Sequence, residues 1–118
     1  MLSRFRLSDD ELINENDFDE FILYVIKCGP YFKVGITGNL TTRISILRDM
    51  IPFSIKRVLK RTVPKALARR FEQHIHDRLA DHCHRGEWFL TDLRTIKLAV
   101  ASAQNCIPRW IGEYRGLR

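Results

Sequence analysis

The chain has 118 residues, 45% hydrophobic side chains and a formal net charge of +6. This composition supplies a core for one small domain and excludes wholesale disorder. Apolar runs such as 21–26 are too short to cross a bilayer, and no signal peptide is predicted, so no membrane partner is expected. The three cysteines are an odd number without a CxxC pair, which indicates reduced thiols and predicts a cytoplasmic location.

Charge divides the chain into parts. Residues 1–20 hold seven acids against Arg4 and Arg6, a net charge of −5, whereas residues 21–118 hold eighteen Lys or Arg against seven acids, a net charge of +11. A segment as basic as 21–118 commonly binds a polyanion, and a basic surface that contacts only water is the alternative. We predict an acidic N-terminal extension over 1–20, a folded domain over 21–106 and a basic C-terminal tail over 107–118.

The elements follow from hydrophobic periodicity and turn residues. Two aromatic and β-branched runs, 21–26 and 31–37, flank Gly29-Pro30 and predict a β-hairpin. Asn39 should cap a helix that ends near Met50, and 53–63 should form a third strand. Pro64 then opens a helix to about residue 80. A loop over 81–86, a short extended segment over 87–90 and a last helix after Thr91 or Asp92 follow. We therefore predict an α+β domain with a small, mostly antiparallel three-stranded sheet flanked by helices.

The predicted hairpin places polar residues on one face of the sheet. If the turn centres on Gly29-Pro30, Tyr24 pairs with Gly35 and Ile26 pairs with Lys33, so that Tyr24, Lys33 and Gly35 share a face. A three-residue loop would instead put Tyr24 and Lys33 on opposite faces. The alternative to a functional role is that Tyr24 sits at the edge of the core and Lys33 is solvated.

Two helical positions place polar groups beside apolar stripes. Arg43 falls within the sector of Leu40, Ile44 and Leu47, where a guanidinium is costly unless it is paired, lies in a cleft or reaches water along its stem. Glu72 borders the stripe of the next helix, and His76 follows one turn later. A carboxylate there is either an ion-pair partner or the ligand of a hard cation. His76 is either a site residue or an ordinary surface histidine.

In this order the residues resemble the GIY-YIG nuclease superfamily, over about residues 21–93. The first half-motif corresponds to Ile22–Tyr24 and the second to Lys33–Gly35, with Lys-Val-Gly in place of Tyr-Ile-Gly. Arg43 matches the family's helix arginine, and Glu72 matches its metal-binding glutamate. The sequence segment Gly-Glu-Trp-Phe at 86–89 is similar to sequences of a phage-associated branch of the superfamily. Such a chain would belong to a bacterial or phage-infected cell.

The resemblance implies a metal-dependent endonuclease that hydrolyses DNA phosphodiester bonds. Glu72 would hold one Mg²⁺ or Mn²⁺ ion, Tyr24 would act as general base, and Arg43 would bind the scissile phosphate. Lys33 would favour the tyrosinate by its charge, and His76 would contact a phosphate oxygen or the water. The expected partner is DNA, and a second copy of the chain or a separate DNA-targeting protein is left open.

Two rival functions remain open on the sequence. The loss of the first motif's glycine and the second motif's tyrosine allows a catalytically inactive nucleic-acid-binding module, which would use Lys56, Arg57, Lys60, Arg61, Arg69 and Arg70. A zinc site built from His76, His82, Cys83 and His84 is the third possibility. Adjacent His-Cys-His residues cannot easily surround one tetrahedral ion, which weighs against zinc.

Overall fold

The computed structural model describes residues 19–116, and the first eighteen residues of the predicted acidic extension lie outside this range. The elements in chain order are β1 (Glu20–Cys28), β2 (Tyr31–Thr37), α1 (Leu40–Met50), β3 (Lys56–Pro64), α2 (Lys65–Arg78), a 3-10 turn (Ala80–His82), β4 (Cys83–Arg85), β5 (Trp88–Leu90) and α3 (Leu93–Gly116). The fold is α+β.

The sheet has five strands in the order β3-β1-β2-β5-β4, and each neighbouring pair is antiparallel. The predicted three-stranded sheet is therefore wrong. Strand β5 falls within the segment 87–90 that was expected to be extended but was not counted in the sheet, and β4 falls within the expected loop 81–86. Each has three residues, and such short segments show no measurable alternation. Gly86 makes their tight connection possible because its φ is +56°, in the left-handed region that glycine adopts without strain.

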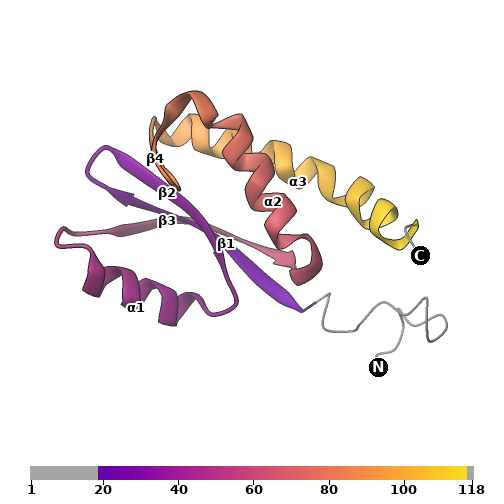
Figure 1. Cartoon of the computed structure of the whole chain (residues 1–118), viewed down its shortest axis with the longest axis horizontal. Coiled ribbons are helices and arrows are strands. Elements are labelled where there is room, and N and C mark those ends of the chain that lie inside the picture. Colours follow the sequence, from indigo (N-terminus) through magenta and orange to yellow (C-terminus); the bar gives the residue numbers. More distant parts are fainter. Residues whose placement is uncertain (1–18, 117–118) are drawn as a thin grey trace.

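Helices cover both faces of the sheet, with α1 on one side and α2 and α3 on the other (Figure 1). The side chains packed between the sheet and α2 and α3 form the large core, which includes Leu23, Val25, Val34, Phe71 and Ile75. On the opposite face, Tyr24, Ile26, Leu40, Ile44 and Leu47 form a small core beneath α1. Alternating residues of β1 thus enter different cores, as the period of two of a β-strand requires.

Local capping fixes where the helices begin. The Oδ1 atom of Asn39 accepts a hydrogen bond from the Thr42 amide at 3.1 Å, which confirms the predicted cap of α1. The Oδ1 atom of Asp92 accepts one from the Thr95 amide at 2.8 Å, ahead of α3. Helix α3 continues through Pro108 to Gly116, so that most of the segment 107–118 extends this helix, and Trp110 is buried in the large core.

The described helices are all too short or too polar for a membrane crossing.

Candidate active site at the open edge of β2

The hairpin has the predicted register. Tyr24 is paired with Gly35 and Ile26 with Lys33, around the turn at Gly29-Pro30, which confirms that Tyr24 and Lys33 share a face. Tyr24 is only 1% exposed, and its ring lies directly over Gly35. A Cβ atom on Gly35 would come within 2.5 Å of the Tyr24 hydroxyl oxygen and 2.7 Å of Cζ. Gly35 is therefore needed so that the tyrosine can lie flat across β2.

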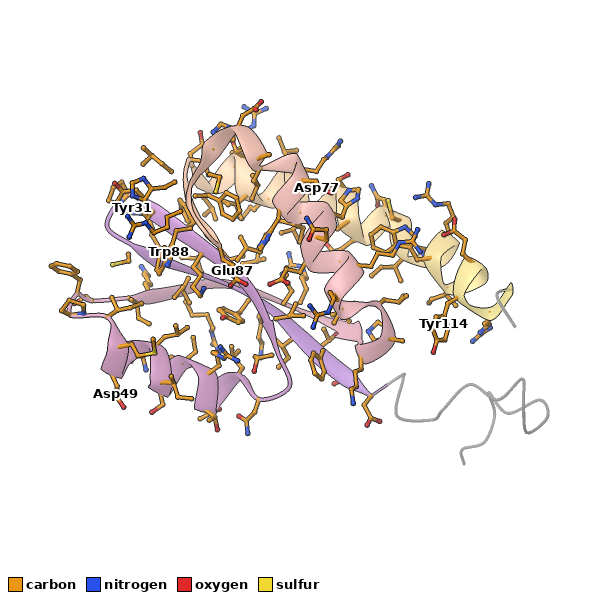
Figure 2. The ribbon with its side chains drawn as sticks, viewed as in Figure 1. Tyr31, Asp49, Asp77, Glu87, Trp88 and Tyr114 are labelled. Atoms are coloured by element: carbon orange, nitrogen blue, oxygen red, sulfur yellow. The ribbon has the colours of Figure 1, made fainter. Side chains whose placement is uncertain are left out.

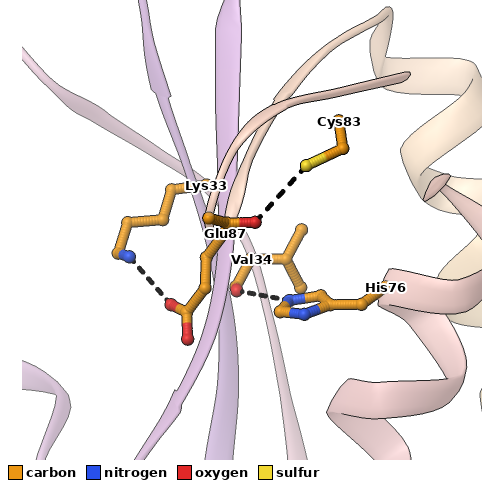
Figure 3. A network of polar contacts seen from close by, with 6 residues as sticks. Lys33, Val34, His76, Cys83 and Glu87 are labelled. Atoms are coloured by element: carbon orange, nitrogen blue, oxygen red, sulfur yellow. Dashed lines mark hydrogen bonds and ion pairs between the residues drawn. The ribbon is translucent and has the colours of Figure 1, made fainter. Parts of the chain in front are cut away.

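The outer edge of β2 is covered by β5 for only part of its length. Strand β5 pairs with Tyr31, Phe32 and Lys33, and the Val34 amide then donates to the Glu87 carbonyl at 3.2 Å. At Val34, helix α2 also contacts the backbone of β2, because His76 Nε2 lies 2.9 Å from the Val34 carbonyl oxygen (Figure 3). A carbonyl can only accept, so Nε2 must carry the proton and Nδ1 is the nitrogen left for other partners.

Glu87 is a site residue that the sequence analysis missed. Its carboxylate Oε1 lies 2.8 Å from Lys33 Nζ, and the two side chains are 42% and 15% exposed respectively (Figure 3). The Glu87 carboxylate also raises the pKa of both Tyr24 and Glu72, which shows that it faces the same site. Its position just before the strand Trp88–Leu90 was visible in the Gly-Glu-Trp-Phe segment, but nothing local indicated which residues it would meet.

Glu72 is the least compensated charge of the cluster. It is half-buried on α2, and within residues 19–116 its carboxylate forms no hydrogen bond or salt bridge. Desolvation by burial raises its pKa, and repulsion from Glu87 adds to the effect, whereas the charges of His76, Arg69 and Lys33 lower it. Removing a carboxylate from water without a partner is unfavourable, so the site favours binding of a cation.

Tyr24 is kept protonated by its surroundings. Burial raises its pKa to about 12, and the carboxylates of Glu87 and Glu72 act in the same direction. The opposing cation is Arg43, which lies exposed on α1 rather than buried in the apolar stripe. Lys33 was predicted to favour the tyrosinate by its charge, and its ammonium is paired with Glu87.

Within residues 19–116, no three His, Cys, Asp or Glu side chains gather at a spacing that would hold a metal ion by themselves. The residues of the zinc alternative do not form a cluster of ligands. His76 bonds to Val34, His84 packs against Tyr31, and Cys83 donates to the Gly86 carbonyl at 3.6 Å. A hard divalent cation needs fewer protein ligands. Mg²⁺ is commonly bound by one or two carboxylates, with waters and phosphate oxygens completing the coordination, and Glu72 beside Glu87 fits that pattern.

The six predicted DNA-binding residues do not share one face of the molecule. Their positions in the register put Arg57 and Lys60 on the α1 face of β3, beside Ile26 and Tyr24, whereas Lys56 and Arg61 alternate onto the other face. Arg70 stacks on Trp110 at 4.7 Å and pairs with Glu113 at 2.8 Å, away from the site.

Two basic residues on the helices, Arg69 and Arg48, have different neighbours. Arg69 is exposed on α2 and acts electrostatically on Glu72. Arg48, which the sequence analysis did not select, lines a cavity of about 410 Å³ with Arg57 between α1 and β3. The basic surface on the α1 face therefore includes Arg43, which acts electrostatically on Tyr24, Lys60, which is paired with it, and Arg48 and Arg57 at the cavity.

The comparison with protein families gives one match. The T5orf172 domain matches residues 14–110, most of the chain, and the chain therefore belongs to the T5orf172 domain family. This family is a phage-associated, GIY-YIG-like group of nuclease-like domains, which agrees with the coarse part of the resemblance drawn from the sequence. Neither the curated proteins nor the solved structures give a match.

Proposed function

We propose that this member of the T5orf172 domain family is a metal-dependent endonuclease that hydrolyses DNA phosphodiester bonds at the open edge of β2. The observation that carries the proposal is Glu72, a half-buried carboxylate repelled by Glu87 and left without a hydrogen bond or salt bridge inside residues 19–116. Such a carboxylate favours binding of a cation. Basic side chains on the adjacent surface suit the phosphates of a DNA substrate.

Each side chain has a role that follows from its position. Glu72, with Glu87 beside it, would hold Mg²⁺ or Mn²⁺, which when bound supplies Lewis-acid stabilisation of phosphate charge. Arg43 is exposed and has no hydrogen bond or salt bridge within residues 19–116, so its guanidinium is available to clamp the scissile phosphate. His76 connects α2 to β2 through Val34, and its Nδ1 has no hydrogen-bond partner among residues 19–116.

The hydrolysis needs a group that accepts the proton of the attacking water. A water oxygen forms a bond to phosphorus, the P–O3′ bond breaks, and the leaving 3′ oxygen takes a proton from solvent water. Tyr24 is the candidate acceptor, but with a pKa of about 12 only about one molecule in 10⁵ is ionised at pH 7. Positive charge at Arg43 and at the Glu72 site favours the tyrosinate, so we propose that Tyr24 accepts the proton only in the assembled complex.

The second candidate is a catalytically inactive nucleic-acid-binding module. It is favoured by the same two observations that weaken the chemistry, namely the protonated Tyr24 and the Lys33 ammonium already paired with Glu87. Both functions predict phosphate contacts, and log K for DNA should therefore fall linearly as log salt rises. Affinity that is unchanged between low and physiological salt would remove DNA as the partner in either case.

Nicking of supercoiled plasmid separates the two candidates. We expect relaxed circles to accumulate with Mg²⁺ or Mn²⁺ and to be absent with EDTA, while DNA binding in EDTA persists. Binding without nicking in either metal, over a range of pH, would leave the binding module and end the nuclease proposal.

A further inference from the structure

A second feature of the α1 face lies four residues along the hairpin from Tyr24. A mostly apolar notch of about 230 Å³ opens at the end of β1 and β2 and is lined by Cys28, Tyr31, Ile51, His84, Arg85 and Trp88. The chain segments that form it are the hairpin turn, the end of α1 and the β4–β5 hairpin. Tyr31 and Trp88 lie near one another at this end of the sheet (Figure 2).

The aromatic residues of the notch are not explained by core packing alone. The Tyr31 and His84 rings lie 4.7 Å apart with an interplanar angle of 41°, and among residues 19–116 neither ring packs into the large or the small core. Trp88 contacts the small core with part of its surface and lines the notch with another part. Partly exposed rings held in this way offer π-faces to a planar ligand.

Charge around the notch selects the kind of planar ligand. Arg85 and His84 are exposed at its rim, and Lys33 Nζ lies 5.7 Å from the centroid of the Trp88 ring. Among the residues that the structure describes, no acidic side chain lines the notch. An apolar pocket with aromatic walls and a basic rim fits an aromatic base that carries an adjacent phosphate, because bases stack on such rings whatever their sequence.

The register gives the distance to the proposed active site. Tyr24 is paired with Gly35, and Cys28 is paired with Tyr31 four residues further along the same face. At about 3.3 Å per residue, the notch lies roughly 13 Å from the Tyr24–Gly35 row. A DNA strand could therefore place a phosphate near Glu72 and a base in the notch within a few nucleotides.

We propose that the notch is a base-stacking subsite that takes one unpaired nucleobase of the DNA strand held at the active site. The inference rests on DNA being the ligand but does not require that the DNA is cut. It predicts that the protein prefers DNA with a single-stranded, bulged or flipped base beside the bound phosphate over a fully paired duplex. Unstacking costs least for a base that is already unpaired, which gives this preference its direction.

The test uses the full chain in EDTA, where no cleavage is expected, and a DNA hairpin with one bulged 2-aminopurine. Fluorescence quenching on binding reports stacking of that base. Tyr31→Ala and His84→Ala should weaken binding of the bulged DNA by about 5- to 150-fold, as loss of one stacked base does. His82→Ala, exposed in the preceding turn and not part of the notch, is the matched control, and Tyr31→Phe should retain quenching.

An abasic bulge supplies the complementary arm. Wild-type protein should bind it more weakly than the 2-aminopurine bulge, and Tyr31→Ala should bind both alike. Equal affinity of wild-type protein for the two DNAs, or equal loss in His82→Ala and Tyr31→Ala, would overturn the subsite. Dissociation of a wild-type dimer by Tyr31→Ala in sedimentation experiments would also overturn it, because the notch would then be an interface between copies. Plasmid nicking by wild type is measured separately, so failure of the subsite and failure of the nuclease are distinguishable.

Discussion

The two faces of the sheet use the same alternating strands for different purposes. On the α2 and α3 face, seventeen buried residues form a continuous apolar core, and polar groups stay at its margin. On the α1 face of the described residues the small core has five members, one of them is the phenol Tyr24, and Lys33 and Glu87 lie beside this tyrosine. The difference indicates that the first face carries most of the stability, while the second retains polar groups that a core would exclude.

The largest expected difference between the two faces is the loss of unfolding free energy when one buried side chain on each face is truncated. Phe71 on α2 is fully buried in the large core, whereas Leu47 on α1 is buried under a single helix and remains 7% exposed. Phe71→Ala should lower the free energy of unfolding by about 3–5 kcal/mol, and Leu47→Ala by an amount near the lower end of the 2–5 kcal/mol range. Chemical denaturation measures both. An equal or larger loss for Leu47→Ala would contradict the assignment of stability to the large core.

A glycine substitution probes the face that holds the site. Gly35→Ala forces the new Cβ against the Tyr24 ring, which is buried and cannot move freely, so we expect a loss of about 1–3 kcal/mol in unfolding free energy and a fall in nicking activity. The control is Gly112→Ala on α3, where a Cβ meets nothing within 4 Å and should stabilise the helix by about 0.5–1 kcal/mol. Wild-type stability and activity in Gly35→Ala would show that Tyr24 does not need to lie across β2.

The smallest expected effect is a pair of opposite pH shifts. Glu87 raises the pKa of Glu72, whereas Lys33 lowers it. Because Glu72 must be ionised to hold a cation, Glu87→Gln should move the acid limb of activity to lower pH, and Lys33→Met should move it to higher pH.

The same substitutions separate electrostatics from simple contact. Glu87 also raises the pKa of Tyr24, so Glu87→Gln should also move the alkaline limb, along which activity rises as the proposed base Tyr24 ionises, to lower pH. Glu113→Gln, whose carboxylate pairs with Arg70 on the far side of α2, is the control and should leave both limbs in place. Shifts in the same direction for Glu87→Gln and Lys33→Met would contradict the placement of this ion pair beside Glu72.

Local signals in the sequence were sufficient for one half of the site. The Gly29-Pro30 turn determines the hairpin register, and with it the shared face of Tyr24, Lys33 and Gly35. Helical periodicity placed Glu72 at a half-buried margin. These features depend on residues close in sequence, where turn geometry and the 3.6-residue period act directly.

The other half depends on contacts between distant segments. The strands Cys83–Arg85 and Trp88–Leu90 are too short for a periodic signal, and only their pairing with β2 brings Glu87 next to Lys33, 54 residues earlier in the chain. The exposed position of Arg43 agrees with one of the alternatives that helical periodicity left open, in which the guanidinium reaches water along its stem. The ion pair between Lys33 and Glu87 was likewise not indicated by the face on which Lys33 lies.

The central claim is that Glu72 holds the cation on which DNA cleavage depends. The most direct measurement is the rate of plasmid nicking in Mg²⁺ and Mn²⁺ for wild type, Glu72→Gln and Glu113→Gln, with DNA affinity measured in parallel. The account predicts that Glu72→Gln loses several orders of magnitude in rate while keeping its fold and its affinity for DNA, and that Glu113→Gln cleaves like wild type. Cleavage by Glu72→Gln at the wild-type rate in either metal would contradict it.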